Sequence, residues 1–253
     1  MSRLDPRFLQ SPLAHRALHG PGRPENSRAA VRAAIAAGYG IEIDVQPSAD
    51  GVPMVFHDYA LDRLTGETGA IRTRAAAALE RVPLTGGAEG IPRLSEILDI
   101  VAGQVPLLIE LKDQDGAMGP SAGPLESGVA AALAGYGGPV AVMSFNGHSV
   151  RRMGELAPGL ARGLTTSAFA PEFWPHLPED LRAHLRTAPE FERAGAHFVS
   201  HEATDLDRPR IAELRARGVP VLCWTIRSAE EERAARRKAD NITFESYAAP
   251  LAA

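Results

Sequence analysis

Short apolar runs alternate with amphipathic helical segments along this chain, and the alternation constrains the fold more than any other feature. The runs lie at residues 12–17, 40–46, 105–112, 139–145, 160–166, 196–202, 219–226 and 241–246. Helical patterns between them include residues 27–38, 94–103, 207–218 and 228–238. Near-continuous apolar strands that alternate with helices are typical of a parallel sheet covered by helices. Eight such units predict a single-domain (β/α)₈ TIM barrel over residues 1–253, with an open doubly wound sheet as the alternative.

One segment departs from this alternation. After the run 40–46 the sequence reads PSADGVPMVFHD, which leaves no room for a helix. The pair Asp50-Gly51 between two extended runs predicts a β-hairpin, in which residues 52–57 fold back antiparallel to residues 41–46. The fold is therefore predicted to be a barrel with an extra β-hairpin after the second strand. Residues 62–92 are expected to form a longer loop with one helix at 73–82, which could act as a lid.

Composition narrows the functional classes. The hydrophobic share of 45% and the charged share of 23% are ordinary for a globular protein. A net charge of −4 gives no general attraction to nucleic acid or to an anionic membrane, so no nucleic-acid partner is expected. No apolar run approaches the roughly 18 residues of a membrane span, and the N-terminus lacks a signal-peptide pattern, so we expect a cytoplasmic protein with no integral membrane segment. Cys223 lies inside an apolar run and is expected to be a buried thiol.

Two of the apolar runs, 40–46 and 105–112, contain charged residues spaced two positions apart, which is the periodicity of a strand. Side chains two apart on a strand share a face, so Glu42 and Asp44 point the same way, as do Glu110 and Lys112. The apolar residues between and beside them take the opposite faces and are expected to meet the helices; they are Ile41, Ile43, Val45, Ile109 and Leu111. The charged set is then predicted to point into the barrel near the carboxyl ends of the strands, where barrel enzymes carry their sites.

Three carboxylates at one point repel one another and require a cation nearby. Lys112 offsets part of their charge, and a divalent metal ion offsets more. Because the set contains only oxygen donors, Glu42, Asp44 and Glu110 are predicted to bind one hard divalent cation, Mg²⁺ or Ca²⁺. The alternative is a salt-bridged edge of the barrel whose carboxylates point into water.

Two histidines and an arginine are expected at the same rim. His15 and Arg16 end the first run, and Arg16 can direct two donors onto a phosphate. Asn26 or Ser27 is predicted to cap the helix that follows. His57 ends the hairpin strand, so one imidazole can take a proton while the other gives one, which suits phosphodiester cleavage.

Two further side chains are placed by strand position. Trp224 is expected to share a strand face with Leu222 and Ile226, and near the strand end it can pack on part of a substrate. Of the histidines around the run 196–202, His201 is the one expected to face the site.

The motifs that carry these residues resemble those of the glycerophosphodiester phosphodiesterase family. The resemblance runs from about residue 12 to about residue 247, and its most specific block extends from residue 40 to residue 69. The matching stretches are AHR…RPENS, GIEIDVQPSADGVPMVFHDYALDRLTGETG, IPRLSEIL, LLIELK, MSFNGHSVRRM and VLCWTIR.

The resemblance implies a metal-dependent (β/α)₈ enzyme that splits a small-molecule glycerophosphodiester into glycerol 3-phosphate and an alcohol. It implies these roles: general acid and base for His15 and His57, metal ligands for Glu42, Asp44 and Glu110, and substrate contacts for Arg16, Lys112 and Trp224. Two alternatives remain open, a lysophospholipase D that uses the aromatic loop 169–177, and a barrel that binds a phosphorylated ligand without catalysis.

The sequence departs from the family pattern at three positions. Ala17 stands where the family usually has Gly, Arg227 where Asn is usual, and Glu245 where Asp is usual. None of these belongs to the predicted catalytic set, and we expect them to affect the choice of substrate.

Overall fold

The computed structural model describes residues 4–251, and the barrel prediction is confirmed. Eight parallel strands close into a ring through the pairing of the first with the second and with the last. These strands are β1 (Leu13–Ala14), β2 (Gly40–Pro47), β4 (Leu107–Leu111), β5 (Val140–Ser144), β6 (Ala161–Thr166), β7 (Phe198–Glu202), β8 (Val221–Ile226) and β9 (Asn241–Phe244). Because the ring is closed, the open doubly wound alternative is wrong.

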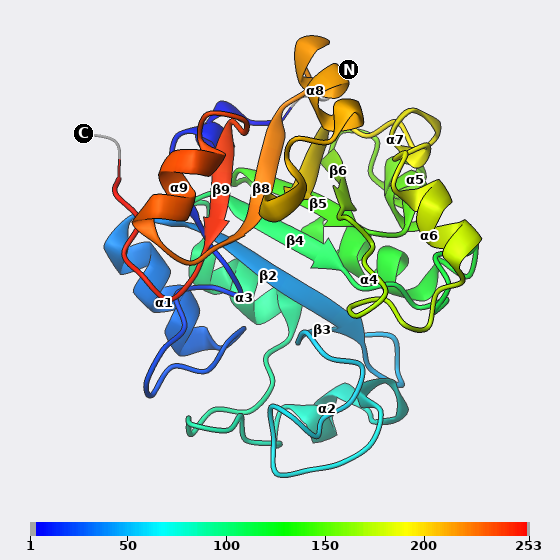
Figure 1. Ribbon diagram of the computed structural model, residues 1–253. Coiled ribbons are helices and arrows are strands. Elements are labelled where there is room, and N and C mark those ends of the chain that lie inside the picture. Colours follow the sequence, from blue (N-terminus) through cyan, green and yellow to red (C-terminus); the bar gives the residue numbers. More distant parts are fainter. Residues whose placement is uncertain (1–3, 252–253) are drawn as a thin grey trace.

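Helices surround the ring on its outside (Figure 1). They are α1 (Arg28–Ala37), α3 (Leu94–Val101), α4 (Pro124–Leu133), α5 (Gly147–Leu156), α6 (Glu179–Leu185), α7 (Glu190–Arg193), α8 (Pro209–Ala216) and α9 (Ala229–Ala235). The structure also has the 3₁₀ helices η1 (Pro6–Leu9), η2 (Ile71–Thr73) and η3 (Ala203–Asp205). Within residues 4–251, no helix has both the length and the apolar character needed to cross a membrane.

The extra hairpin forms where the sequence predicts it. Strand β3 (Pro53–Val55) pairs antiparallel with β2, with Val55 opposite Val45 and Pro53 opposite Pro47. Gly51 adopts a φ of +77°, a left-handed conformation that glycine reaches without a steric cost. The amide of Phe56 then donates to the carbonyl of Asp44 at 3.0 Å, which carries the chain back along β2 toward the barrel mouth.

Alternation along the strands separates an outer and an inner core. The outward side chains pack against the helices, for example Ile41, Ile43 and Ile109. Cys223 on β8 also belongs to this outer core, and burial raises the pKa of its thiol to about 12. The inner core at the amino ends of the strands is apolar and is closed by Phe8 of η1; its other members are Leu4, Leu13, Leu108, Ala141, Met143, Ala161, Phe198 and Leu222.

Two glycines make room for large side chains inside this inner core. A Cβ at residue 163 would lie 2.2 Å from the ring of Phe198, and a Cβ at residue 40 would lie 2.5 Å from Leu13. Protein interiors are packed too closely to absorb such overlaps without displacement. Gly163 and Gly40 therefore allow Phe198 and Leu13 to pack in the inner core.

The segment between β3 and α3 lies at the bottom of Figure 1 and includes the short helix α2 (Ala76–Leu79). It has a buried core of its own, made of Met54, Phe56, Leu61, Ile71, Ala76, Leu79, Val82, Leu84 and Ile91. The helix is shorter than the predicted 73–82, and the longer loop predicted around it is packed on this buried core. A buried apolar core ties this segment to the fold, so the structure gives no support to its role as a lid.

Candidate active site

Three carboxylates converge inside the barrel at its carboxyl end. Glu42 and Asp44 come from β2 and Glu110 from the neighbouring β4, where Asp44 and Glu110 are paired in register. Their candidate ligand oxygens all lie within 4.8 Å of one another. All three residues are buried, so the alternative of carboxylates that point into water is wrong. The cluster has the all-oxygen composition of a site for a hard divalent cation.

Lys112 bridges two of the three carboxylates. Its Nζ lies 2.6 Å from Asp44 Oδ1 and 2.6 Å from Glu110 Oε1. Burial alone would lower the pKa of Lys112, but the charges of Asp44 and Glu110 hold it above its ordinary value. Burial would likewise raise the pKa of Asp44, but the charges of Lys112, His57 and Arg16 hold it far below its ordinary value. Asp44 is therefore a carboxylate and Lys112 an ammonium.

Among residues 4–251, no Lys or Arg side chain forms an ion pair of this kind with Glu42. Its Oε2 accepts a hydrogen bond from the backbone N–H of Arg16 at 2.9 Å. Burial raises the pKa of Glu42 well above its ordinary value, and the charges of Asp44 and Glu110 raise it further. Glu42 is thus the carboxyl group whose ionised form the protein's own cations stabilise least, and a bound divalent cation would stabilise that form.

The motif Pro-Glu-Asn-Ser before α1 builds the same site. Ser27 caps α1 by accepting a hydrogen bond from the amide of Ala30, so of the two predicted capping residues it is Ser27 that serves. Asn26 instead faces the carboxylate cluster: its Nδ2 donates to Asp44 Oδ2 at 2.9 Å, and its Oδ1 accepts from the Asp44 amide at 3.1 Å. Asn26 therefore fixes the orientation of Asp44.

Arg16 lies between the carboxylate cluster and a second acidic residue. Its NH1 donates to Glu25 Oε1 at 2.7 Å, and its Nε lies 3.7 Å from Asp44 Oδ2. That Nε is buried and has no hydrogen-bond partner in the part of the chain that the structure describes, so the guanidinium keeps donor capacity at the site. Burial would raise the pKa of Glu25, but its bonds to Arg63 and the charge of Arg16 hold it below its ordinary value. Glu25 is therefore ionised, and its carboxylate holds Arg16 in place.

His57 interacts with the charge of Asp44 and is held by a carboxylate of its own. Its Nδ1 lies 2.6 Å from Asp58 Oδ1, and Arg63 donates to both oxygens of Asp58 at 2.7 Å. The same arginine reaches Glu25, with contacts of 3.0 and 2.9 Å. Burial would raise the pKa of Asp58, but these partners hold it far below its ordinary value. A continuous chain of ion pairs thus links His57 to the residue that anchors Arg16.

His15 follows β1, as the sequence predicts, and has a carboxylate partner of its own. Its Nδ1 lies 2.6 Å from Glu245 Oε2, and Arg227 donates through Nε to Glu245 Oε1 at 2.8 Å. Burial lowers the pKa of His15, while the bond to Glu245 opposes that shift. The hydrogen bond from His15 holds the pKa of Glu245 far below its ordinary value, so Glu245 is ionised.

Aromatic side chains pack together into a wall that includes Trp224. Trp224 donates through Nε1 to the carbonyl of Ser200 at 3.2 Å, and its ring lies edge-on to Phe145 with centroids 5.6 Å apart. Phe145 in turn packs against Trp174 at 4.9 Å. Leu222 belongs to the inner core, as the predicted face requires, but Ile226 belongs to the outer core. A register shift between Cys223 and Ile226 reverses the alternation, so the prediction for Ile226 is wrong.

His201 does not face the site. It alternates with Phe198, which points into the inner core, and shares its outward face with Val199. Its Nδ1 lies 2.7 Å from Thr166 Oγ1, and its Nε2 lies 3.1 Å from the carbonyl of Asp205. The prediction for His201 is therefore wrong, because strand alternation outweighs its position near the carboxyl end.

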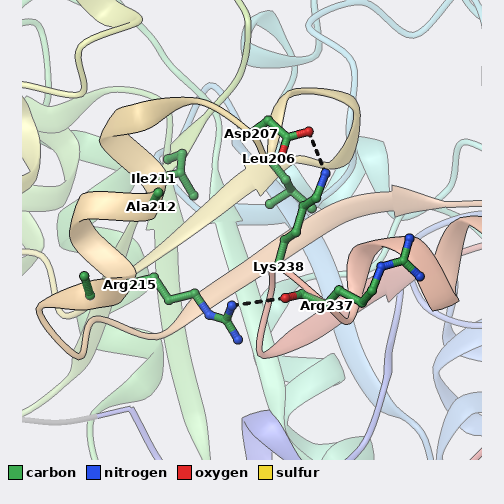
Figure 2. A pocket seen from close by; sticks show the side chains of 8 residues that line it. Leu206, Asp207, Ile211, Ala212, Arg215, Arg237 and Lys238 are labelled. Atoms are coloured by element: carbon green, nitrogen blue, oxygen red, sulfur yellow. Dashed lines mark hydrogen bonds and ion pairs between the residues drawn. The ribbon is translucent and has the colours of Figure 1, made fainter.

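An outer groove between α8 and the end of α9, with a cavity volume of about 530 Å³, is separate from this site (Figure 2). Its cations are already engaged: Lys238 lies 2.6 Å from Asp207, and Arg215 donates to the carbonyl of Arg237 at 3.2 Å. It contains none of the residues that the sequence assigns to catalysis, metal binding or substrate contact. The chemistry-bearing residues are those inside the barrel.

Sequence reasoning did not assign a positioning role to the residues that hold the predicted ones in place, namely Glu25, Asn26, Asp58, Arg63, Arg227 and Glu245. Three of them carried a signal. Asp58 directly follows His57. Glu25 and Asn26 directly precede Ser27, which by itself caps the helix α1. Glu245 contacts a histidine 230 residues away in the sequence, which no local pattern reveals.

A closed (β/α)₈ barrel with buried carboxylates, an ammonium and two carboxylate-bound imidazoles at the carboxyl ends of its strands defines a barrel enzyme equipped for acid–base chemistry on an anionic substrate. The family model described as the glycerophosphoryl diester phosphodiesterase family matches residues 15–244. Because this match spans most of the chain, the protein belongs to that family. It is a glycerophosphodiester phosphodiesterase, a phosphoric diester hydrolase.

Individual relatives agree with this assignment. YhdW of Bacillus subtilis strain 168, whose name places it provisionally in the same class, is 29% identical over 224 residues, which are 85% of each chain. A glycerophosphodiester phosphodiesterase of Caldanaerobacter subterraneus is 29% identical over 64% of this chain and 68% of its own. A solved Oleispira antarctica phosphodiesterase, in complex with the product sn-glycerol-3-phosphate, superposes with a TM-score of 0.78 at 25% identity and covers 95% of this chain and 94% of its own. Membership of this family excludes the non-catalytic barrel as an alternative.

Proposed function

We propose that this enzyme hydrolyses glycerophosphodiesters to glycerol 3-phosphate and an alcohol, with one divalent cation, Mg²⁺ or Ca²⁺, at its carboxylate cluster. The observation that carries the proposal is the cluster of three buried carboxylates whose charge Lys112 only partly offsets, with His15 and His57 both close enough to Asp44 to interact with its charge. The product named in the Oleispira antarctica structure, sn-glycerol-3-phosphate, supports the substrate class.

The carboxylates of Glu42, Asp44 and Glu110 would hold the cation. Their oxygens are close enough together to share one ion, and the raised pKa of Glu42 marks the charge that such an ion would neutralise. When bound, the ion supplies positive charge beside the non-bridging oxygens of the phosphate, where negative charge develops during the reaction.

Arg16 and Lys112 would bind the phosphate. The Nε of Arg16 has a free N–H, and Glu25 holds the guanidinium in place. The ammonium of Lys112 has three N–H donors, of which Asp44 and Glu110 take two, so one remains for a phosphate oxygen. Trp224 would pack on the glycerol or alkyl part of the substrate.

The two histidines would move the protons. In this proposal His15 removes the proton from the attacking oxygen, and His57 donates a proton to the oxygen of the leaving alcohol. Each imidazole has its Nδ1 against a carboxylate, so each leaves Nε2 for the substrate. General acid–base catalysis of this kind contributes about 10²- to 10⁴-fold in rate.

One observation favours a second substrate class, the lysophospholipids cleaved by a lysophospholipase D. The loop 169–177 carries Phe173, which is 74% exposed, next to Trp174, which packs against the aromatic wall. An exposed aromatic side chain that continues such a wall could accommodate part of an acyl chain.

A turnover assay with Mg²⁺, Ca²⁺ or EDTA on glycerophosphocholine and on lysophosphatidylcholine tests both substrate classes. We expect release of glycerol 3-phosphate from glycerophosphocholine with either ion and none in EDTA. Undiminished turnover in EDTA would contradict the role of the cation. Preferential cleavage of lysophosphatidylcholine that falls in the Phe173→Ala variant would favour the second class, and Leu9→Ala, an exposed apolar residue near the opposite end of the barrel, is the matched control.

A further inference from the structure

We propose that Glu245, held by Arg227, is a positioning residue for His15: it fixes the imidazole proton on Nδ1 and leaves Nε2 as the atom that accepts a proton at the reacting centre. The inference rests on the proposed function, in which His15 acts on the substrate, and adds to it two residues that lie outside the predicted catalytic set.

Backbone hydrogen bonds place the three residues side by side. His15, Arg227 and Glu245 each directly follow one of three adjacent strands, β1, β8 and β9. The amide of His15 donates to the carbonyl of Phe244 at 2.8 Å, and the amide of Glu245 donates to the carbonyl of Ile226 at 2.9 Å. The barrel itself therefore sets the spacing between the imidazole, the carboxylate and the guanidinium.

The side chains use both oxygens of the carboxylate. Glu245 Oε2 lies 2.6 Å from His15 Nδ1, and Oε1 accepts from Arg227 Nε at 2.8 Å. The side chains of His15 and Glu245 are only 15% and 16% exposed, so this contact is largely shielded from water. The other ionisable groups near it are His19, whose Nε2 lies 3.5 Å from Glu245 Oε2, and Arg16 and Asp44, whose charges act on His15.

A neutral imidazole carries one proton, and its position decides which nitrogen can act as a base. With the proton on Nδ1, His15 donates to the carboxylate of Glu245, and Nε2 presents a lone pair. With the proton on Nε2, the lone pair of Nδ1 would lie against a carboxylate oxygen at 2.6 Å, which is repulsive. The ionised carboxylate therefore selects the tautomer that a general base requires.

The other histidine has the same arrangement, built from different elements. His57 Nδ1 lies 2.6 Å from Asp58 Oδ1, and Arg63 donates to Asp58 through Nε at 2.7 Å. An imidazole–carboxylate–guanidinium series thus occurs twice near the carboxylate cluster. Arg227 and Glu245 are also two of the positions at which the sequence departs from the family pattern, and the structure shows that these two departures contact each other.

The test compares Glu245→Gln with wild type in steady-state kinetics and in ¹⁵N NMR of the histidine side chains. We expect kcat to fall by about 10²-fold while KM stays close to wild type, since the substrate contacts are retained. We also expect the His15 signals to show Nδ1–H in the neutral wild-type imidazole and a mixture of tautomers in the variant. Glu245→Asp should recover part of the loss, and Glu155→Gln, which breaks an exposed ion pair with Arg152, should change neither readout.

The variant Arg227→Ala provides a second test, of the role of the arginine that holds Glu245. We expect it to lower kcat by about tenfold in the wild-type background and to have little further effect in the Glu245→Gln background, because the two residues act as a unit. A Glu245→Gln variant that folds and keeps more than half of the wild-type kcat would overturn the proposal. So would a wild-type His15 whose proton is on Nε2, a result that stands even if the Gln variant fails to fold. If wild type turns over no glycerophosphodiester, the proposed function fails, while the NMR result still decides the positioning of His15.

Discussion

Replacement of Glu42 by Gln should stabilise the metal-free protein and destabilise the metal-bound one relative to wild type. Glu42 lies with two other carboxylates inside the barrel, and its oxygen accepts a backbone N–H from Arg16. Gln keeps the size of the side chain and an acceptor oxygen but removes the charge. The matched control is Glu110→Gln, because Glu110 is already paired with Lys112 at 2.6 Å and its loss removes an attraction together with a repulsion.

The expected change in unfolding free energy follows from the separation of the charges in the carboxylate cluster. Two unit charges 4.8 Å apart, the largest separation in the cluster, repel by about 3.5 kcal/mol at an effective dielectric constant of 20. Proton uptake by Glu42, whose raised pKa favours it, relieves part of this repulsion in wild type. We therefore expect Glu42→Gln to raise the free energy of unfolding in EDTA by about 1–3 kcal/mol, and Glu110→Gln to give no gain.

Urea denaturation at neutral pH, in EDTA and in saturating Mg²⁺, measures these differences. Binding of the ion to the folded state stabilises wild type in proportion to the logarithm of the ion concentration. The order of stability should therefore reverse in Mg²⁺, with wild type above Glu42→Gln. If Glu42→Gln is less stable than wild type in EDTA by more than about 1 kcal/mol, the electrostatic reasoning behind the carboxylate cluster is refuted.

Three further predictions concern catalysis, packing and pH. His15→Ala and His57→Ala should each lower kcat at least about 100-fold without weakening Mg²⁺ binding in calorimetry; near wild-type turnover in either variant would contradict its acid–base role. Gly163→Ala should lower the free energy of unfolding by about 1–3 kcal/mol in urea denaturation, because the new Cβ overlaps the ring of Phe198, and Phe198→Leu in the same chain should recover part of that loss; an unchanged midpoint would contradict this packing. Burial lowers the pKa of His201 below its ordinary 6.5, so the unfolded chain binds more protons than the folded one as pH falls. Its contribution to stability should be present above pH 6.5 and lost progressively below it, so His201→Gln should flatten the decline in unfolding free energy between neutral and mildly acidic pH; equal declines in both proteins would count against the buried neutral imidazole.

The barrel could be predicted because its strands follow from local pattern. Each apolar run coincides with a strand to within about three residues, and the Asp50-Gly51 turn forms the hairpin that the sequence indicates. The sequence also predicts which way Glu42, Asp44 and Glu110 point. On a regular strand, side chains alternate, so these carboxylates must lie on the face opposite to their apolar neighbours.

The errors arise where strand geometry is irregular or competes with another signal. The register shift in β8 moves Ile226 to the outer core. No residue type in VLCWTI predicts this shift. The prediction for His201 gave more importance to the strand end than to alternation with Phe198, although alternation was readable from the sequence. Residues 62–92 are predicted to form a longer loop with one helix, and the buried core that they share with Met54 and Phe56 depends on contacts that no local pattern reveals.

The residues that hold the site together depend on contacts across the barrel. Asn26 has the residue type and position of a helix cap, yet its side chain binds Asp44, 18 residues further along. Glu245 and Arg227 meet His15 because β8, β9 and β1 are neighbours in a closed ring. Such contacts become visible only once the topology is known.

The central claim is that Glu42, Asp44 and Glu110 together bind one divalent cation. Anomalous diffraction from crystals grown with Mn²⁺, a stand-in for a hard divalent ion, tests it directly. We predict one strong peak that contacts oxygens of all three carboxylates and disappears in the Glu42→Gln variant. A peak bound elsewhere in the barrel, or no peak at saturating Mn²⁺, would contradict the account.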